Sequence, residues 1–505
     1  MVSSFVRFVL GIVLVALLVA CPAAPVGGVQ SVAIVGGDRT VVVGASVALE
    51  VEVATSGGAS GAVDWSSDAP GVVAVDASSG EAEALAVGTA TISATSVADP
   101  SKSDAIDVTV DPAGVLRWTR QFGTAFNDLA SAIAVGADGR VYVAGQTFGA
   151  LEGANAGGLD AFVRAYDADG ALRWTRQFGT SALDLASGVA VDPMGRVYVA
   201  GITSGALEGV NAGGQDAFVR SYDADGVLRW TRQFGTSSSE FFSCVAVDTA
   251  GRVYVSGSTP DALEGPSFGQ SDAFLRSFDA DGAVRWTRQF GTTLTDVASC
   301  VAVDAEGHPY VVGYTNGAFP GEVSSGGSDA FVRSFDADGN VRWTRQFGSP
   351  SNDQAAGVAV DGAGRVVVVG YADGVLEGAS AGSRDAFVRS YDADGVVRWT
   401  RQFGSSASDQ ARAVAIDVSG AVAVVGSTEG SIGGPNAGDA DAFVRTFDAE
   451  GAVRWTRQFG TASEDALGDV AVDAAGRLYA SGFSDGALVG VSEGERDAIL
   501  VSYGP

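Results

Sequence analysis

An acidic side chain stands ten residues after each of seven regularly spaced tryptophans. These acids are Asp128, Asp184, Glu240, Asp296, Asp353, Asp409 and Asp465. A ring of carboxylates could hold a hard cation such as calcium, which prefers oxygen ligands. Alternatively, each acid caps backbone N–H groups of its own loop, as Asp commonly does. Capping is the favoured interpretation, and calcium is the one cofactor that the sequence leaves open.

The remaining residues suggest no catalytic site. His308 is the only histidine, so a Ser-His-Asp set would have to use it. The sequence contains neither a zinc-ligand cluster nor a phosphate-binding glycine loop followed by a helix. The Asp-Ala-Asp-Gly turns lack the other ligands of an EF-hand. We therefore predict a protein that is not an enzyme. Acid pairs for glycoside hydrolysis stay an alternative because acids are abundant.

The tryptophans mark a repeat of 56 or 57 residues. They are Trp118, Trp174, Trp230, Trp286, Trp343, Trp399 and Trp455. Such a period indicates a solenoid or a propeller. The unit beginning at Leu172 contains four strand-like runs, "LRWTRQFG", "SGVAVD", "RVYVAG" and "DAFVRSYD". Asp-x-x-Gly sequences between the runs are typical of type I turns. Four strands in each of seven units predict a seven-bladed β-propeller over residues 115–505.

The phase of the repeat predicts how the ring closes. Small "VAVD" runs suit the crowded axis and bulky "WTRQFG" runs suit the rim. The chain ends after a third strand, so its last blade lacks an outer one. We expect residues 115–122 to complete that blade and cover its edge, which would otherwise be open to aggregation.

One stretch of a unit, "GTSALDLASGVAVDPMGRVYVAGIT…GGQDAFVRSYDADG", resembles the seven-bladed β-propeller repeat family of bacterial extracellular proteins. The resemblance covers all seven units. It implies the fold and says little about function.

Arginines alternate with aromatic residues in every unit, which could indicate nucleic-acid binding by stacking. The charge argues against that reading, because 31 Lys and Arg face 60 Asp and Glu, a net charge of −29. We expect guanidinium groups stacked on rings between blades, with acids pairing their charge.

Two cysteines, Cys244 and Cys300, occupy matching positions in neighbouring units. Stacked sheets lie about 10 Å apart, beyond disulfide reach. The prediction is two buried free thiols.

The N-terminus is typical of an export signal. Arg7 precedes an apolar run, Phe8–Ala20, that is too short to span a bilayer. The run ends in "LVAC", Leu18–Cys21, which resembles the bacterial lipobox. That resemblance implies a signal peptide at 1–20, lipid on Cys21 and a tether at 21–30. The alternative is an ordinary signal peptide with an accidental cysteine.

Residues 31–111 predict a small β-sandwich, because short alternating strands recur about every ten residues. The segments "VDWSSD", "VVAVD" and "VGTATISATS" resemble the bacterial Ig-like domain of intimin-type surface proteins. In that family such domains act mainly as spacers or adhesive modules.

The connections between second and third strands are the longest and differ most between units, so binding specificity could be built there. We expect a monomeric lipoprotein, anchored in a membrane through Cys21 at the cell surface or the periplasmic face, that serves as a binding scaffold through one propeller face. A glycan or a surface protein would be the ligand, and nucleic acid is excluded. A carbohydrate-active enzyme and a purely structural surface protein are the alternatives.

Overall fold

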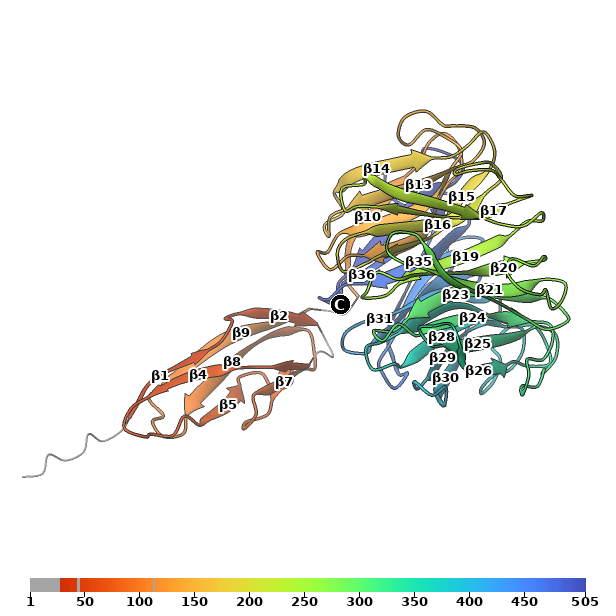
Figure 1. Cartoon of the computed structure of the whole chain (residues 1–505). Helices are drawn as coiled ribbons and strands as arrows, with labels where there is room; N and C mark the ends of the chain where they lie inside the picture. The colour runs from red at the N-terminus through yellow and green to blue at the C-terminus, as the bar shows by residue number, and fades with distance from the viewer. Residues whose placement is uncertain (1–27, 43–45, 112–113) are drawn as a thin grey trace, which may run out of the picture. The chain divides into compact units, whose positions relative to one another are not determined.

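The computed structural model describes residues 28–42, 46–111 and 114–505 (Figure 1). The signal peptide, Cys21 and most of the tether therefore lie outside the described residues. The chain divides into two compact units, Met1–Pro112 and Ala113–Pro505. Among the described residues, no helix has the length and apolar character needed to cross a bilayer.

The first unit is built from nine strands around one apolar core. They are β1 (Val29–Ile34), β2 (Arg39–Val42), β3 (Ser46–Ala48), β4 (Val51–Thr55), β5 (Val63–Ser67), β6 (Val73–Val75), β7 (Glu81–Ala84), β8 (Gly88–Ser96) and β9 (Ser103–Asp111). They form sheets in the orders β2-β9-β8-β5, β3-β7-β6 and β1-β4. Trp65, Ile92 and Val108 lie in the shared core because alternate residues of these strands turn inward.

The second unit is a ring of seven four-stranded antiparallel blades, so the predicted β-propeller is confirmed. We number the blades along the chain, blade 1 starting at Asp128. The first strands, which contact one another around the axis, are β11 (Asp128–Val135), β15 (Asp184–Val191), β19 (Phe241–Val247), β23 (Asp296–Val303), β27 (Asp353–Val360), β31 (Asp409–Ile416) and β35 (Asp465–Val472). The "VAVD" runs are therefore innermost, as predicted.

The other strands follow in order toward the rim. The second strands are β12 (Val141–Thr147), β16 (Val197–Thr203), β20 (Val253–Thr259), β24 (Pro309–Thr315), β28 (Val366–Ala372), β32 (Val422–Thr428) and β36 (Leu478–Ser484). The third strands are β13 (Asp160–Tyr166), β17 (Asp216–Tyr222), β21 (Asp272–Phe278), β25 (Asp329–Phe335), β29 (Asp385–Tyr391), β33 (Asp441–Phe447) and β37 (Asp497–Tyr503). The outer strands, which carry the tryptophans, are β14 (Leu172–Phe178), β18 (Leu228–Phe234), β22 (Val284–Phe290), β26 (Val341–Phe347), β30 (Val397–Phe403), β34 (Val453–Phe459) and β10 (Leu116–Phe122).

The ring closes through its first and last strands. Blade 7 has the order β10-β37-β36-β35, so β10 supplies the outer strand that the C-terminal sequence lacks. β10 pairs antiparallel with β37, and Thr119 lies opposite Val501. The predicted latch is confirmed.

Arginine–aromatic stacking joins neighbouring blades. The guanidinium carbon of Arg220 in blade 2 lies 4.3 Å from the ring centre of Phe178 in blade 1. Its Nε donates to Thr231 Oγ1 at 3.0 Å, while Nε of Arg176 donates to the Gly226 carbonyl at 2.8 Å. The stacking prediction is confirmed, but carbonyl and hydroxyl oxygens do most of the pairing that we expected from acids.

The Asp-x-x-Gly turns have the predicted geometry. In the turn after β17, the Gly226 N–H donates to the Asp223 carbonyl at 3.0 Å. Gly226 has a φ of 78°, which a residue with a Cβ rarely adopts. A Cβ there would also lie 2.9 Å from the Trp174 ring. Glycine thus allows the turn to pack against the tryptophan of the preceding blade.

Candidate binding site in the propeller channel

The seven predicted acids lie at the start of the innermost strands and are fully buried. In blade 2, Asp184 Oδ2 accepts hydrogen bonds from the Thr180 N–H at 2.6 Å and the Thr180 hydroxyl at 2.9 Å. The other six acids accept the same pair of bonds from the Thr or Ser four residues earlier. Each acid therefore fixes its own loop.

A second set of acids, which the sequence analysis missed, faces the first set between blades. Its members are Asp160, Asp216, Asp272, Asp329, Asp385, Asp441 and Asp497, each the first residue of a third strand and fully buried. A Cβ on Gly179 would collide with carboxylate oxygens of both Asp160 and Asp184, so these acids approach across that glycine. Burial raises the pKa of Asp296, and the neighbouring Asp272 carboxylate raises it further. The sequence signal for this second set is the Asp-Ala pair that begins every third strand, followed by Phe in six of the seven.

The channel itself contains a cavity of about 250 Å³. A β-bulge interrupts every innermost strand at the same place, and bulges re-aim side chains at functional sites. The seven residues at the bulge all line the cavity and are Ser131, Ser187, Ser243, Ser299, Ala356, Arg412 and Gly468. We call them the bulge ring. Its sevenfold symmetry is broken by a single charged member, Arg412.

The cysteine prediction was wrong. Cys244 and Cys300 form a disulfide, and their Cα atoms lie 4.8 Å apart. Sheet spacing of about 10 Å applies to flat packed sheets, whereas propeller blades converge at the axis, where both cysteines lie. They are half-buried and line the channel cavity next to the bulge ring, so they are not buried thiols.

Arg412 carries an unbalanced charge in the channel wall. Its Nη2 lies 3.4 Å from Ser427 Oγ, and its buried Nε has no hydrogen-bond partner. Among the described residues, no carboxylate lies within 4.0 Å of its guanidinium group. Burial lowers the pKa of Arg412, the nearby Glu464 carboxylate raises it, and the Arg496 charge lowers it further, with a net decrease.

Asp469 is the one carboxylate that lines the channel cavity in the described part of the chain. Its Oδ2 accepts the Ile133 N–H and its Oδ1 accepts the Val470 N–H, both at 2.8 Å. Burial raises the pKa of Asp469 to about 7, against these two hydrogen bonds, which lower it. The group therefore titrates near neutral pH.

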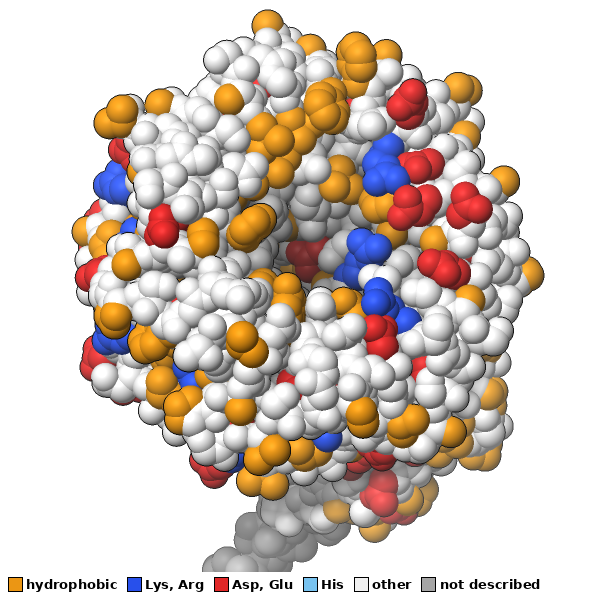
Figure 2. Space-filling model, turned by 90° about the vertical axis from the view of Figure 1, so that its right-hand side faces the viewer, with side chains coloured by type: hydrophobic (Ala, Val, Ile, Leu, Met, Phe, Trp, Pro, Cys, Tyr) orange, Lys and Arg blue, Asp and Glu red, His pale blue; other side chains and the backbone are white. Residues whose placement is uncertain are grey.

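Two further arginines flank Arg412 at the mouth where the long connections leave the second strands. The Arg384 guanidinium carbon lies 4.0 Å from the Tyr371 ring centre in blade 5, and that of Arg496 lies 3.7 Å from Phe483 in blade 7. Figure 2 shows this face, with basic side chains gathered along one side of the central hollow and acidic ones beside them.

These flanking arginines, unlike Arg412, are paired with acids. Arg384 Nε lies 2.7 Å from Asp373 Oδ1. Arg496 contacts Asp485 at 2.6 Å and Glu464 at 2.9 Å. Other blades carry Leu, Gln, Ser or Ala where Arg384 and Arg496 stand. Blades 5, 6 and 7 thus form an arginine arc made of Arg384, Arg412 and Arg496.

The opposite side of the mouth is apolar. The residue directly after the first acid of each blade is apolar in blades 1 to 4, where it is Leu129, Leu185, Phe241 and Val297. Phe241 is 57% exposed. In blades 5 to 7 the same position is Gln354, Gln410 or Ala466. The mouth therefore has an apolar side and a cationic side.

His308 takes a structural place. Its Nδ1 lies 2.9 Å from Asp304 Oδ2, which also accepts the Tyr310 hydroxyl at 3.1 Å. In blade 5 an arginine, Arg365, pairs with the corresponding acid at 3.0 Å. With Glu306, His308 and Asp304 make the one cluster of three possible metal ligands among the described residues. Because the Asp304 carboxylate already accepts local bonds, we assign the cluster to the turn.

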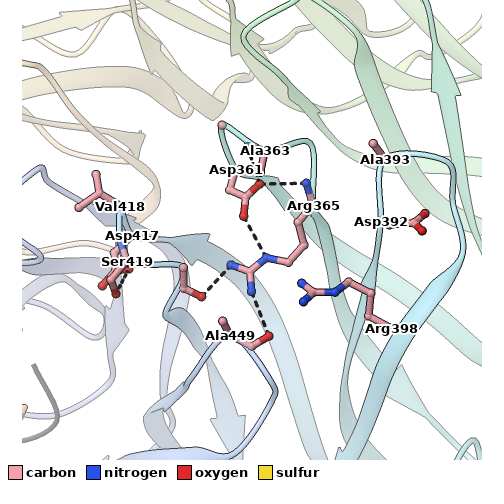
Figure 3. A pocket seen from close by; sticks show the side chains of 12 residues that line it. Asp361, Ala363, Arg365, Asp392, Ala393, Arg398, Asp417, Val418, Ser419 and Ala449 are labelled. Atoms are coloured by element: carbon pink, nitrogen blue, oxygen red, sulfur yellow. Dashed lines mark hydrogen bonds and ion pairs between the residues drawn. The ribbon is translucent and has the colours of Figure 1, made fainter. Parts of the chain in front are cut away.

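Another hollow, of about 630 Å³, lies among the turns of blades 5 and 6 (Figure 3). Arg365 crosses it and donates to the Gly420 carbonyl at 2.7 Å and the Ala449 carbonyl at 3.1 Å. The hollow is open and its central arginine holds two blades together. The channel, where a charge is left without a partner, is the stronger candidate site.

Family comparisons agree with both parts of this architecture. Residues 28–106 match the bacterial Ig-like domain (group 2), and residues 173–207 and 342–377 match the beta-propeller repeat. The chain is a β-propeller repeat protein with an N-terminal bacterial Ig-like domain.

Curated relatives are similar over part of the repeat region. Regulatory protein FlaEY of Caulobacter vibrioides is 30% identical over 196 residues, which is 34% of this chain and 20% of the relative. An uncharacterised WD repeat-containing protein of Acanthamoeba polyphaga mimivirus is 23% identical over 176 residues, 29% of this chain and 13% of the relative. This chain thus spans a fifth or less of these relatives.

Solved structures are more distant. A puromycin hydrolase gives a TM-score of 0.44 at 15% identity, covering 71% of this chain and 50% of its own. A polysaccharide lyase of family PL25 gives a TM-score of 0.43 at 12% identity, and the match covers 75% of this chain and 95% of the lyase. A Bacteroides caccae protein of unknown function gives a TM-score of 0.38 at 9% identity, and the match covers 65% of this chain and 97% of that protein. Values this low contribute nothing to a functional assignment.

Proposed function

We propose that this chain is an exported lipoprotein, anchored in a membrane through Cys21, whose propeller binds a ligand at the channel mouth. The observation that carries the binding role is the arginine arc. Scaffold residues recur sevenfold, whereas Arg384, Arg412 and Arg496 depart from the repeat on three consecutive blades and at the same mouth. A binding site is typically a concave surface with a few specifically placed polar groups, and residues that differ from the repeat provide such groups at the channel mouth.

The anchoring role is supported by the sequence of the leader. A charged n-region, a short apolar run and a cysteine directly after "LVA" form the pattern that precedes lipid attachment. The disulfide in the channel is consistent with an oxidising compartment outside the cytoplasm. The Ig-like domain would then serve as a spacer between membrane and propeller.

Two experiments test these roles separately. The full chain, expressed in a bacterial host with an alkyne-labelled fatty acid, should incorporate label and stay in the membrane fraction. Cys21→Ser should abolish the label and release the protein. Wild-type protein that remains unlabelled and leaves the membrane fraction would refute the anchor.

For ligand binding, the mature chain should be screened on glycan and peptide arrays. Binders should be rechecked with Arg384→Ala and Arg496→Ala variants, because both side chains flank the mouth. Arg398→Ala is the matched control, since Arg398 is exposed and lines the distant hollow of Figure 3. Loss of binding in the mouth variants alone supports the proposal. No binder, or equal effects in all three variants, contradicts it.

A further inference from the structure

A bare positive charge within a strongly acidic protein is the starting point. Of the 31 basic residues, Arg412 is the one placed in the bulge ring. The nearby Glu464 carboxylate stabilises the Arg412 charge only at longer range, because its ion pair is with Arg496 at 2.9 Å, while Asp373 pairs with Arg384 at 2.7 Å. Burying a cation without an ion-pair partner is costly. A bound anion that pairs with Arg412 would offset this cost.

The rest of the bulge ring supplies hydroxyl groups. Ser131, Ser187, Ser243 and Ser299 stand in blades 1 to 4, and in a ring of seven the blades opposite Arg412 are blades 2 and 3. Each serine hydroxyl can donate one hydrogen bond and accept others. A ligand in the cavity would therefore meet a guanidinium at one end and hydroxyl groups at the other.

The size of the cavity limits the ligand. At about 250 Å³ it lies below the range of drug-sized pockets. The planar guanidinium fork matches a carboxylate, which accepts two parallel N–H bonds. Asp469 lines the same cavity, but its carboxylate accepts the N–H groups of Ile133 and Val470 and makes no ion pair with Arg412.

We propose that the channel binds a small hydroxylated carboxylate, such as a sugar acid, with its carboxylate on Arg412 and its hydroxyl groups on the serines of the bulge ring. This inference rests on the proposed binding role and adds the class of ligand. The arginine arc would attract the anion to the mouth, and Arg412 would hold it.

The test is titration calorimetry of the mature chain with four probes. D-glucuronate carries both features, glucose lacks the carboxylate, hexanoate lacks the hydroxyl groups, and inorganic phosphate is an anion of different shape. We expect glucuronate to bind most tightly. Arg412→Ser should weaken it about tenfold to a hundredfold, because a hydrogen bond to a charged group is lost.

Serine is a suitable replacement because the same ring position is serine in four other blades. Arg412→Lys, which keeps the charge without the fork, should bind between the wild type and the serine variant. Ser187→Ala should weaken glucuronate but leave hexanoate unchanged. Melting temperatures would verify that all variants are folded.

Four outcomes would overturn the inference. Wild-type protein that binds no glucuronate at millimolar concentrations excludes the ligand class. Unchanged glucuronate affinity in Arg412→Ser shows that Arg412 does not bind the carboxylate. Phosphate binding as tightly as glucuronate shows a general oxyanion site. If arrays reveal a ligand whose binding needs Arg384 and Arg496 but not Arg412, the proposed function stands and this inference fails.

Discussion

The carboxylate of Asp469 in the last blade accepts the backbone N–H of Ile133 in the first blade at 2.8 Å. This bond joins the innermost strands β35 and β11 across the interface between blades 7 and 1, where the ring closes. The same position is Ala, Gly or Cys in the other blades. At this position the seam therefore contains a carboxylate, which the other six interfaces between blades lack.

Stability should depend on the protonation of Asp469. Its pKa of about 7 lies above the ordinary value of 3.8. Between these values the folded chain keeps a proton that the unfolded chain releases, so the free energy of unfolding falls as pH rises from about 4 to about 7. Above that range this contribution is constant.

Asp469→Asn should remove that dependence, because the amide does not titrate. Urea unfolding of both proteins at several pH values measures the difference, and the variant should gain relative stability as pH rises. Asp169→Asn is the control, since that side chain is 87% exposed. A parallel pH dependence in wild type and Asp469→Asn would contradict the assignment.

The latch predicts a sharp difference between two truncated chains. A chain that begins at Gly114 keeps β10, whereas one that begins at Thr124 lacks it and leaves the edge of β37 open. The first should melt as the propeller of the full chain does. The second should melt at a lower temperature and aggregate as its concentration rises. Differential scanning calorimetry with light scattering checks both, and equal behaviour would exclude a stabilising role for the latch.

Breaking the Cys244–Cys300 disulfide should destabilise the propeller. The bond closes a loop with a sequence separation of 56, and a loop of this length contributes at most about 4 kcal/mol in the chain-entropy model. Cys244→Ser, Cys300→Ser and the double variant should all lower the free energy of unfolding. Dithiothreitol should lower that of the wild type alone. Insensitivity of the wild type to reduction would show that the thiols are free.

The buried acids should act as loop caps. Asp184→Asn should lower the free energy of unfolding by about 1–3 kcal/mol, because one or both bonds from Thr180 lose a charged acceptor. Asp225→Asn, at an 85% exposed side chain, should have little effect. Calcium and EDTA should leave the melting temperature of the wild type unchanged. A clear rise with calcium would favour the cation interpretation instead.

Repetition made the fold predictable. The seven tryptophans fixed the period, and the small "VAVD" runs identified the inner strands, since bulky residues do not fit where blades converge. The latch followed from a chain that stops after a third strand. The stacking of Arg220 on Phe178 was predictable for the same reason, because the same stack recurs in six of the seven interfaces between blades.

The site was predictable only in part. The acids at the start of the innermost strands were recognised from the sequence. Their burial between blades depends on contacts with the second set of acids, such as Asp160, and the alternation of apolar and polar residues does not reveal those contacts. The disulfide was missed because sheet spacing was applied to strands that meet at an axis. Nothing in the sequence singled out Arg412 among the other arginines, because the β-bulge that directs its side chain into the channel is visible only in the structure.

The β10–β37 pairing also sets an order of events for the growing polypeptide. Six blades consist of contiguous sequence and can assemble as soon as they emerge, but the seventh waits for the last residues to meet a partner made nearly four hundred residues earlier. The propeller ring therefore cannot close until β37 has been synthesised and has paired with β10.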